Sequence, residues 1–294
     1  MSRLRGGFVG LFVAFCLLPD FAHAQELEEK PYFVTYNHYL EEPDALETEV
    51  EAVHGRDADI NNFVGGVTEF EYGATKWWTS ELYLDWQHTN HQGSAFTGFR
   101  LENRFRLFVE PHKINPVLYL EYEHISEADK VLKEIVGFDS KEDLQVPNSI
   151  ARHNYENELE TRLILSSDFG KWNLSENIIA EKNLGGGSWE FGYAAGISRA
   201  LGPRTGNRCA FCAGNFTVGV EAYGGAGTWR NLTFNNTSQY IAPTLLWVLP
   251  SETVIRFSPG WGLTDQSVGT LFRVSVSQEF DDVGKKIGKL FHKH

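Results

Sequence analysis

The chain has 294 residues, of which 26 are Lys or Arg and 39 are Asp or Glu, giving a formal net charge of −13. This acidic balance argues against a nucleic-acid partner, because phosphate backbones bind positively charged surfaces. Aromatic residues make up 14% of the chain, against 10 prolines and 1 methionine, and this favours strands because aromatic rings pack well on a pleated sheet.

The first 24 residues have the pattern of a secretory signal. Two early arginines precede an apolar stretch at 8–18, and a small-x-small motif follows at 22–24. The apolar stretch is shorter than the roughly 20 residues that a membrane-spanning helix needs. We therefore expect residues 1–24 to be cleaved after export, and we expect the next segment, 25–44, to lie in the periplasm.

From residue 45 to residue 280 the sequence alternates apolar and polar side chains with a period of two, as strands with two different faces do. Around 95–110, for example, Phe99, Leu101 and Phe105 alternate with charged residues. The pattern predicts twelve strands, near 45–54, 62–73, 76–88, 95–110, 116–125, 152–166, 171–182, 188–200, 215–226, 238–249, 252–262 and 267–280.

The length of these segments separates two architectures that share this alternation. In a soluble sandwich the apolar faces of two sheets would meet each other, whereas in a membrane barrel they would meet lipid. Segments of about 10 residues fit barrel strands better than soluble strands, which average roughly 5–6 residues. We therefore predict a single closed barrel and keep the exported sandwich as the alternative.

On these amphipathic segments, the signal motif at 22–24 and a last strand that ends on Phe280, the chain resembles bacterial outer-membrane β-barrel proteins of the porin and channel-like class. The resemblance implies an antiparallel up-and-down barrel at 45–280 in the outer membrane of a Gram-negative bacterium, with lipid around it and both termini in the periplasm. It also implies that Phe280 belongs to a sorting signal read by the barrel-assembly machinery. The basic tail at 281–294 departs from the class, which usually ends at that aromatic residue.

The charged faces of the strands are the main functional clue, because in a barrel they would line the lumen. We predict passive passage of small polar solutes or ions, without a cofactor, and two alternatives stay open: a non-conducting structural or interaction barrel filled by salt bridges, and an outer-membrane lipid hydrolase. An apolar pattern at 128–136 predicts a short helix that caps or enters the mouth, or a loop packed on its own rim. The lumen candidates are Arg100, Glu102, Arg104, Arg106, Glu121, Glu123, Glu156, Glu158, Glu160 and Arg162.

Two smaller motifs suggest other chemistry. Cys209 and Cys212 form the only C-x-x-C motif, for which we predict a local disulfide in an oxidising compartment, with a redox or metal role as the alternative. His88 and Ser94 could serve a hydrolase, but position 90 is Asn where a strand-borne serine nucleophile would be expected. We therefore assign no catalytic residue and no metal ligand.

Overall fold

The computed structural model describes residues 31–132, 135–203 and 209–286. The expected signal at 1–24 and the end of the basic tail, 287–294, lie outside the described residues. In the described ranges, no helix is long and apolar enough to cross a membrane.

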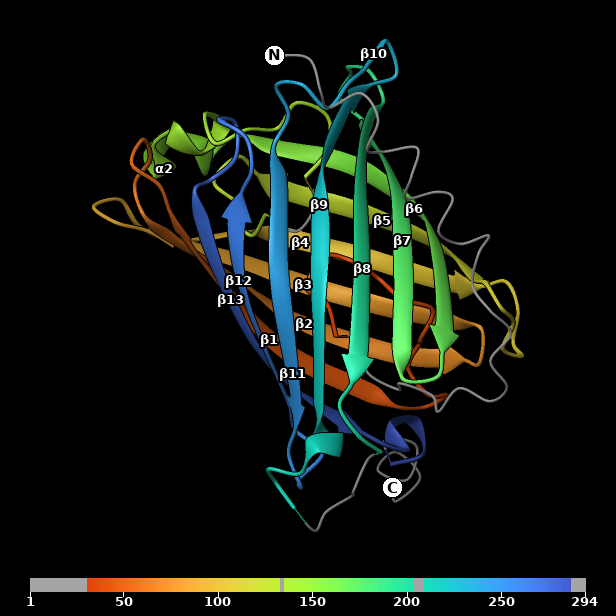
Figure 1. The fold of residues 1–294 in the computed structure, drawn as a ribbon. Coiled ribbons are helices and arrows are strands. Elements are labelled where there is room, and N and C mark those ends of the chain that lie inside the picture. Colours follow the sequence, from red (N-terminus) through yellow and green to blue (C-terminus); the bar gives the residue numbers. More distant parts are fainter. Residues whose placement is uncertain (1–30, 133–134, 204–208, 287–294) are drawn as a thin grey trace, which may run out of the picture.

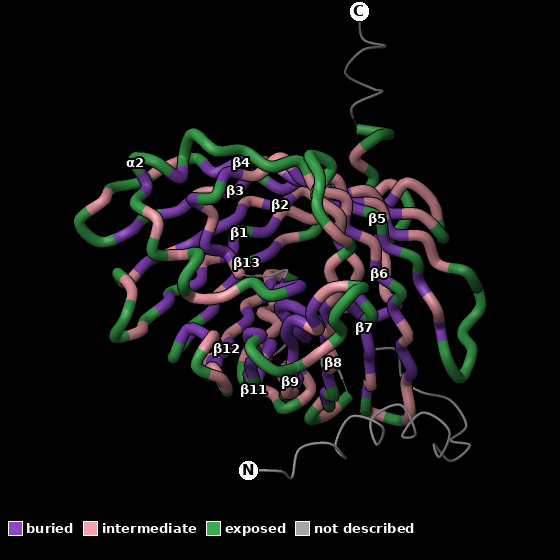
Figure 2. Tube along the Cα trace, turned by 90° about the horizontal axis from the view of Figure 1, so that it is seen from above, coloured by how far each residue is buried: buried purple, intermediate pink, exposed green. Residues whose placement is uncertain are grey.

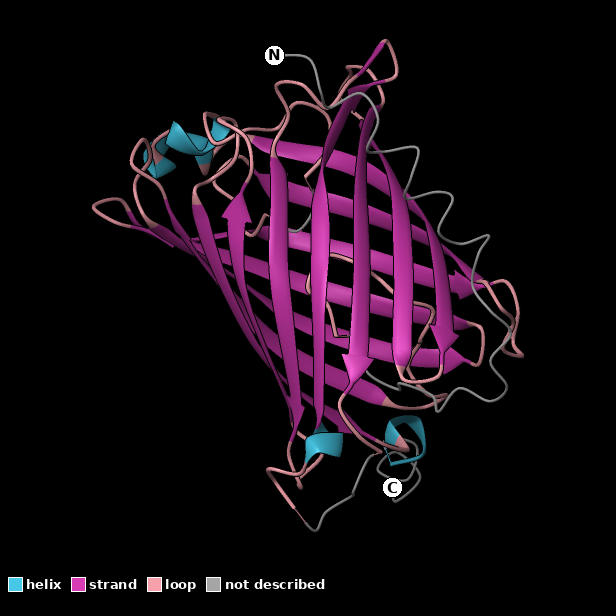
Figure 3. Cartoon of the chain, viewed as in Figure 1, coloured by secondary structure: helices cyan, strands magenta, loops and turns pink. Residues whose placement is uncertain are grey.

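Twelve long strands make up the fold, together with one two-residue strand, β10 (Asn231–Leu232), and three short helical turns, η2 (Asp143–Gln145), α2 (Asn148–Ala151) and η4 (Ala213–Asn215) (Figure 3). The long strands are β1 (Leu46–Arg56), β2 (Phe63–Thr75), β3 (Trp78–Thr89), β4 (Gly93–Arg106), β5 (Asn115–Ser126), β6 (Tyr155–Phe169), β7 (Trp172–Asn183), β8 (Glu190–Ala200), β9 (Phe216–Thr228), β11 (Gln239–Val248), β12 (Val254–Gly262) and β13 (Thr270–Phe280).

The predicted strands are all present, and the largest difference is at the end of β4. The pattern predicted that this strand would continue to residue 110, whereas it ends at Arg106. Its neighbours stop at the same level, because β3 begins at Trp78 and β5 begins at Asn115. Residues 107–110 begin with three consecutive apolar residues, Leu107, Phe108 and Val109, so the alternation breaks there. Apart from a bond from the Leu107 amide to the Pro116 carbonyl, the described ladders do not continue past Arg106.

The strands close into one ring, because each pairs antiparallel with its neighbours and the two ends of the sheet meet (Figure 1). β1 pairs with β13 from Leu46↔Phe280 to Arg56↔Thr270, and β8 pairs with β9. β10 only extends the hairpin that follows β9. The predicted all-β, up-and-down barrel of twelve strands is therefore confirmed, and the two stacked sheets of a sandwich are absent from the described chain.

The two faces of the ring differ in chemistry. Large apolar side chains point outward and are exposed, among them Val50 (53%), Leu101 (44%), Leu118 (45%) and Phe272 (46%). The inward side chains alternate with them along each strand and are mostly buried. An apolar surface of this kind is typical of contact with hydrocarbon rather than with water.

The inside of the ring is filled with protein. Seen from above, the chain crosses the interior, and buried residues gather there (Figure 2). The main apolar cluster joins inward residues of the strands, such as Tyr223 and Tyr240, to Phe33 and Val34 before β1 and to Ile135 in the connection between β5 and β6. The barrel core is thus built partly from segments outside the sheet.

Candidate functional site

The structure places the ten predicted lumen residues on the inward side of β4, β5 and β6. Arg100, Glu102, Arg104, Glu121 and Arg162 are among those that are buried, with exposed fractions of 2% or less. Toward the open end of β6 the exposure rises, so that Glu158 is half-buried and Glu156 is exposed.

These charges are paired with acidic side chains of the same strand or of nearby strands of the wall, instead of facing each other across an open lumen. Arg104 contacts Glu71 and Glu81 and lies 2.9 Å from Glu102. Arg100 lies 3.0 Å from Asp85 and 3.5 Å from Glu121, and Arg162 contacts Glu160. The acidic partners Glu71 of β2 and Glu81 and Asp85 of β3 also lie at inward positions of their strands. They were not among the predicted lumen candidates.

The segment before β1 lies inside the barrel. The sequence predicts a periplasmic segment at 25–44, of which 25–30 lies outside the described residues. The described part, 31–44, runs into the ring of strands from its exposed end at Glu42 and Pro43 (Figure 1). Tyr32, Phe33, Val34 and Tyr36 are 8% exposed or less. We call residues 31–44 the lumenal segment.

The backbone amides of the lumenal segment are held by side chains of the wall. The Glu221 carboxylate of β9 accepts hydrogen bonds from the amides of Phe33 (3.2 Å), Val34 (3.0 Å) and Thr35 (2.9 Å). The side-chain amide of Asn177 on β7 accepts from the Tyr36 amide at 2.7 Å and donates to the Tyr36 carbonyl at 2.8 Å. The amides of Phe33 to Tyr36 and the Tyr36 carbonyl, which have no sheet partner, thereby find hydrogen-bond partners.

The carbonyl groups of the same segment are held by arginines. The donor–acceptor pairs are Arg256 to Tyr32 (2.7 Å), Arg162 to Val34 (3.1 Å), Arg106 to His38 (3.1 Å) and Arg104 to Tyr39 (3.2 Å). Three of these four arginines are predicted lumen residues. In this structure, therefore, they bind the protein's own backbone as well as the acidic wall.

Close packing reinforces this attachment at β8. A methyl group added at Gly196 would lie 2.5 Å from a ring carbon of Tyr32, well inside normal contact distance. The Tyr32 hydroxyl also donates to the carbonyl of Asn173 at 3.2 Å. Glycine is needed at position 196 because the aromatic ring lies directly on the strand backbone.

The connection between β5 and β6 fills the other end of the lumen. Val131, Ile135 and Val136 are buried, the Leu132 carbonyl accepts a hydrogen bond from Arg273 at 2.6 Å, and Gly137 forms a bridge to Gly227. The helix predicted at 128–136 is wrong for the described residues there. Leu132 has a positive φ of 55°, which a right-handed helix excludes.

Two cavities remain inside the barrel, one next to the lumenal segment and one under the β5–β6 connection. The first, of about 590 Å³, is lined by residues next to the lumenal segment, including Glu41, Glu42, Glu47, Glu279 and Asp281, and we call it the terminus-side cavity. The second, of about 480 Å³, lies under the β5–β6 connection, and we call it the loop-side cavity. Its lining contains one lysine, Lys141, and eight carboxylates: Glu123, Glu127, Asp129, Asp139, Asp143, Glu156, Glu158 and Glu181.

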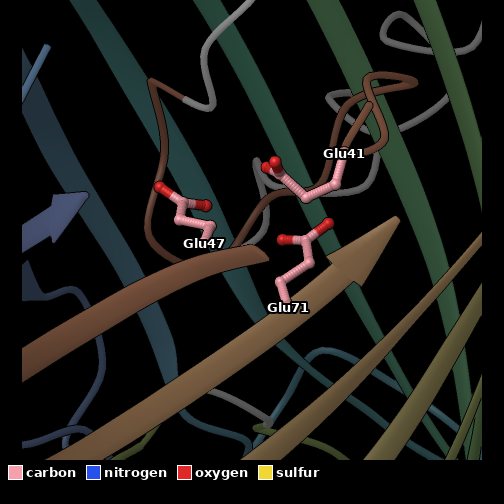
Figure 4. A group of neighbouring side chains, drawn as sticks. All are labelled: Glu41, Glu47 and Glu71. Carbon is pink, nitrogen blue, oxygen red and sulfur yellow. The ribbon is translucent and has the colours of Figure 1, made fainter. Parts of the chain in front are cut away.

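Three carboxylates meet at the terminus-side cavity. Glu41 of the lumenal segment, Glu47 of β1 and Glu71 of β2 lie with oxygen atoms within 4.8 Å of one another (Figure 4). Carboxylate oxygens are ligands for hard cations, but Glu71 is already in contact with Arg104. Of the three, only Glu41 and Glu47 line the cavity and add negative charge to its wall, and we assign no metal ion to the group.

The two smaller motifs are also placed by the structure. Cys209 and Cys212 form a disulfide, with Cα atoms 5.6 Å apart. His88 Nδ1 lies 2.9 Å from Ser94 Oγ on the exposed rim of the β3–β4 hairpin. Among the described residues, no carboxylate contacts this histidine to orient it.

No family model matches the chain, and no curated protein is similar to it in sequence. Among solved structures, it is similar to the COG4313 outer membrane channel from Pseudomonas putida F1, with a TM-score of 0.52, 10% identity, 86% of this chain covered and 100% of that one. At this identity the likeness concerns the fold alone.

Two further solved structures are less similar. The translocator domain of the autotransporter NalP from Neisseria meningitidis has a TM-score of 0.41 at 9% identity, covering 80% of this chain and 88% of that one. Outer membrane phospholipase A from Escherichia coli has a TM-score of 0.40 at 12% identity, covering 87% and 95%. Neither likeness is close enough to bear on function. The chain has the closed-barrel fold found in bacterial outer-membrane proteins.

Proposed function

We propose that this protein is an outer-membrane channel for small polar solutes, with a preference for cations, and that the lumenal segment closes it. The observation that carries the proposal is the way this segment is attached. Residues 31–44 are covalently joined to the barrel only through β1, and the described contacts are hydrogen bonds and packing. Contacts of this kind can break without unfolding the ring.

The membrane location is supported by the outer face of the ring. Exposed apolar side chains surround the strands, and exposed tryptophans lie near strand ends, namely Trp77, Trp172, Trp189 and Trp229. Tryptophan is typical of the boundary between hydrocarbon and water. With this apolar surface in the membrane, we expect the short turns, such as those between β2 and β3 and between β6 and β7, to face the periplasm together with both chain ends.

The cation preference is supported by the charge of both cavities. Eight carboxylates and one lysine line the loop-side cavity. The terminus-side cavity combines Lys76 and Arg106 with seven carboxylates: Glu41, Glu42, Glu47, Glu110, Glu252, Glu279 and Asp281. Clefts lined by one sign of charge concentrate counter-ions, so a cation entering from either end would meet a favourable potential.

Planar bilayers test the proposal directly. The full chain is expected to show low conductance with brief openings, and a variant lacking residues 31–40 is expected to show long, larger openings in the same preparation. Both should first run anomalously on unheated gels, as intact barrels do. If the shortened variant is a folded barrel and yet shows no conductance, the channel proposal is wrong, and the protein is better explained as a non-conducting interaction barrel.

One observation favours a second candidate, a lipid hydrolase. His88 and Ser94 are within hydrogen-bonding distance at 2.9 Å, as a base and its nucleophile would be. Replacing His88 by Ala should abolish phospholipid release if this pair acts as an enzyme. If the original protein releases no phospholipid product, or if His88→Ala releases as much as the original protein, the hydrolase is ruled out.

A further inference from the structure

The loop-side cavity carries an excess of negative charge. Eight carboxylates line it against one lysine, Lys141. The Lys141 amine lies 2.8 Å from Asp59 and 3.4 Å from Asp57, and neither aspartate lines the cavity. The positive charge of Lys141 is therefore taken up by carboxylates outside the cavity, and the lining keeps a charge that a cation from solution can balance.

Four of the lining carboxylates lie close enough to repel one another. Glu156 repels Glu158 on the same strand, and both Glu158 and Asp143 repel Asp139 of the β5–β6 connection. Among the described residues, none of these four forms an ion pair with a lysine, arginine or histidine. Asp139, Asp143 and Glu156 are exposed, so a cation can reach them from solvent. The other four lining carboxylates are buried or accept hydrogen bonds from neighbouring side chains: Glu123, Glu127, Asp129 and Glu181.

A buried hydroxyl group also belongs to this cavity. Ser126, at the end of β5, is among the lining residues, and its side chain is only 1% exposed. Within the described chain, its hydroxyl oxygen has no hydrogen-bond partner. Native structures leave few buried polar groups in that state, and an unmet one calls for a partner such as a bound ligand. A hydroxyl oxygen accepts a hydrogen bond from an ammonium group.

Part of the cavity wall is apolar, which distinguishes it from a site for a metal ion. These lining residues come from β5, from the β5–β6 connection and from the segment before β13, and they are Ile125, Leu132, Ile135, Leu144, Val146 and Val268. Ile135 and Val268 belong to the main apolar cluster, with exposed fractions of 4% and 0%. Such a wall buries hydrocarbon, whereas hard cations take oxygen ligands. The volume of about 480 Å³ is within the range of small-molecule sites, roughly 300–1,000 Å³.

We propose that the loop-side cavity binds an organic ammonium ion whose hydrocarbon part packs on the apolar wall. The carboxylates of Asp139, Asp143, Glu156 and Glu158 balance its positive charge, and the Ser126 hydroxyl accepts a hydrogen bond from one of its N–H groups. This inference goes beyond the proposed channel, because the cavity would hold the ligand even in a barrel that conducts nothing.

Binding of hexylamine, which is protonated at neutral pH, tests the site in the full chain in lipid nanodiscs. Hexanol has the same hydrocarbon chain without the charge, and methylamine has the charge without the chain. Equilibrium dialysis, with empty nanodiscs as the blank, measures all three without any conductance. Hexylammonium is expected to bind at least about tenfold more tightly than either control, because each control lacks one of the two recognised parts. Equal binding of hexylammonium and methylammonium would overturn the proposal, since the cavity would then only concentrate counter-ions.

Variants locate the bound ligand. Glu158→Gln removes a lining carboxylate and should weaken hexylammonium binding about tenfold. Glu142→Gln removes an exposed charge on the same connection but outside the cavity, and it should leave binding unchanged. Leu144→Ala should weaken binding of hexylammonium more than binding of methylammonium.

Two results would contradict this assignment. Equal losses in E158Q and E142Q would mean that the overall charge attracts the ligand, and displacement of bound hexylammonium by equimolar calcium would indicate a metal site instead. Heat-modifiable migration of each variant on gels shows that the barrel is intact, so that a loss of binding is not a loss of fold.

Discussion

At the scale of single residues, Glu221 is the strongest link between the lumenal segment and the wall. One buried carboxylate accepts three backbone amides, and hydrogen bonds to charged groups contribute about 1.5–3 kcal/mol each. Because the three bonds share one anchor, we expect Glu221→Ala to weaken attachment of the segment by about 2–4 kcal/mol. The measurements are the closed times of single channels and the rate of protease cleavage within 31–44.

The control for Glu221 is Glu51→Ala. Glu51 is equally buried and pairs with Arg273 at 3.0 Å, and that arginine contacts the β5–β6 connection rather than the lumenal segment. Cleavage within 31–44 should therefore stay at its original rate in E51A. If both variants release the segment equally, loss of any lumenal carboxylate is sufficient and Glu221 has no special role.

The sequence predicted which way charged residues point but not what they bind. Period-two alternation placed Arg104 and Arg162 inward because that pattern is local to one strand. Their partners come from elsewhere: Arg104 contacts Glu71 of β2, and Arg162 holds the Val34 carbonyl, 128 residues away. Glu221 was not identified, because it lies in a strand rich in glycine, alanine and valine, and its partners are amides that no sequence motif marks.

At the scale of elements, the two segments that fill the barrel were the least predictable parts of the fold. Residues 31–38 carry no strand partner and no helix pattern, and their conformation is set by side chains of β7, β9 and β12. In the β5–β6 connection the apolar residues Val131, Ile135 and Val136 were singled out by the sequence, and they are buried. Their spacing indicated a helix, but contacts with the barrel wall determined the backbone.

The β5–β6 connection should respond to pH through Asp129. Burial raises the pKa of Asp129 to about 7, helped by repulsion from Asp85, while hydrogen bonds from the Thr97 hydroxyl and the Val131 amide act in the opposite direction. A free loop would have an ordinary pKa near 3.9. The docked connection therefore binds the proton more tightly, so docking strengthens as pH falls from about 7 toward 4 and is weakest above 7.

Hydrogen exchange of peptides covering 126–146, corrected for intrinsic rates, measures this dependence. Protection is expected to be greater at pH 5.5 than at pH 8, and Asp129→Asn should remove most of the difference because it cannot ionise. A difference of the same size in D129N would assign the pH response to another group in the loop-side cavity.

At the scale of the whole molecule, the charges of the two cavities combine into one prediction about selectivity. Both ends of the lumen are lined mainly by carboxylates, whereas the arginines between them are paired with acidic side chains and with the lumenal segment. With residues 31–40 deleted, we expect cations to permeate more readily than anions, on the order of tenfold at low salt. The preference should decline toward 1 M salt, where the Debye length is about 3 Å.

Reversal potentials under a KCl gradient measure this preference, and paired variants locate its source. Glu127→Gln with Glu156→Gln removes two exposed charges from the loop-side cavity, while Glu142→Gln with Asp265→Asn removes two exposed charges outside both cavities. The first pair should lower the cation preference and the second should leave it unchanged, although both change the net charge equally. Equal effects would mean that the overall charge of −13 sets the selectivity, and an anion preference would mean that the arginines freed by removing the segment dominate the path.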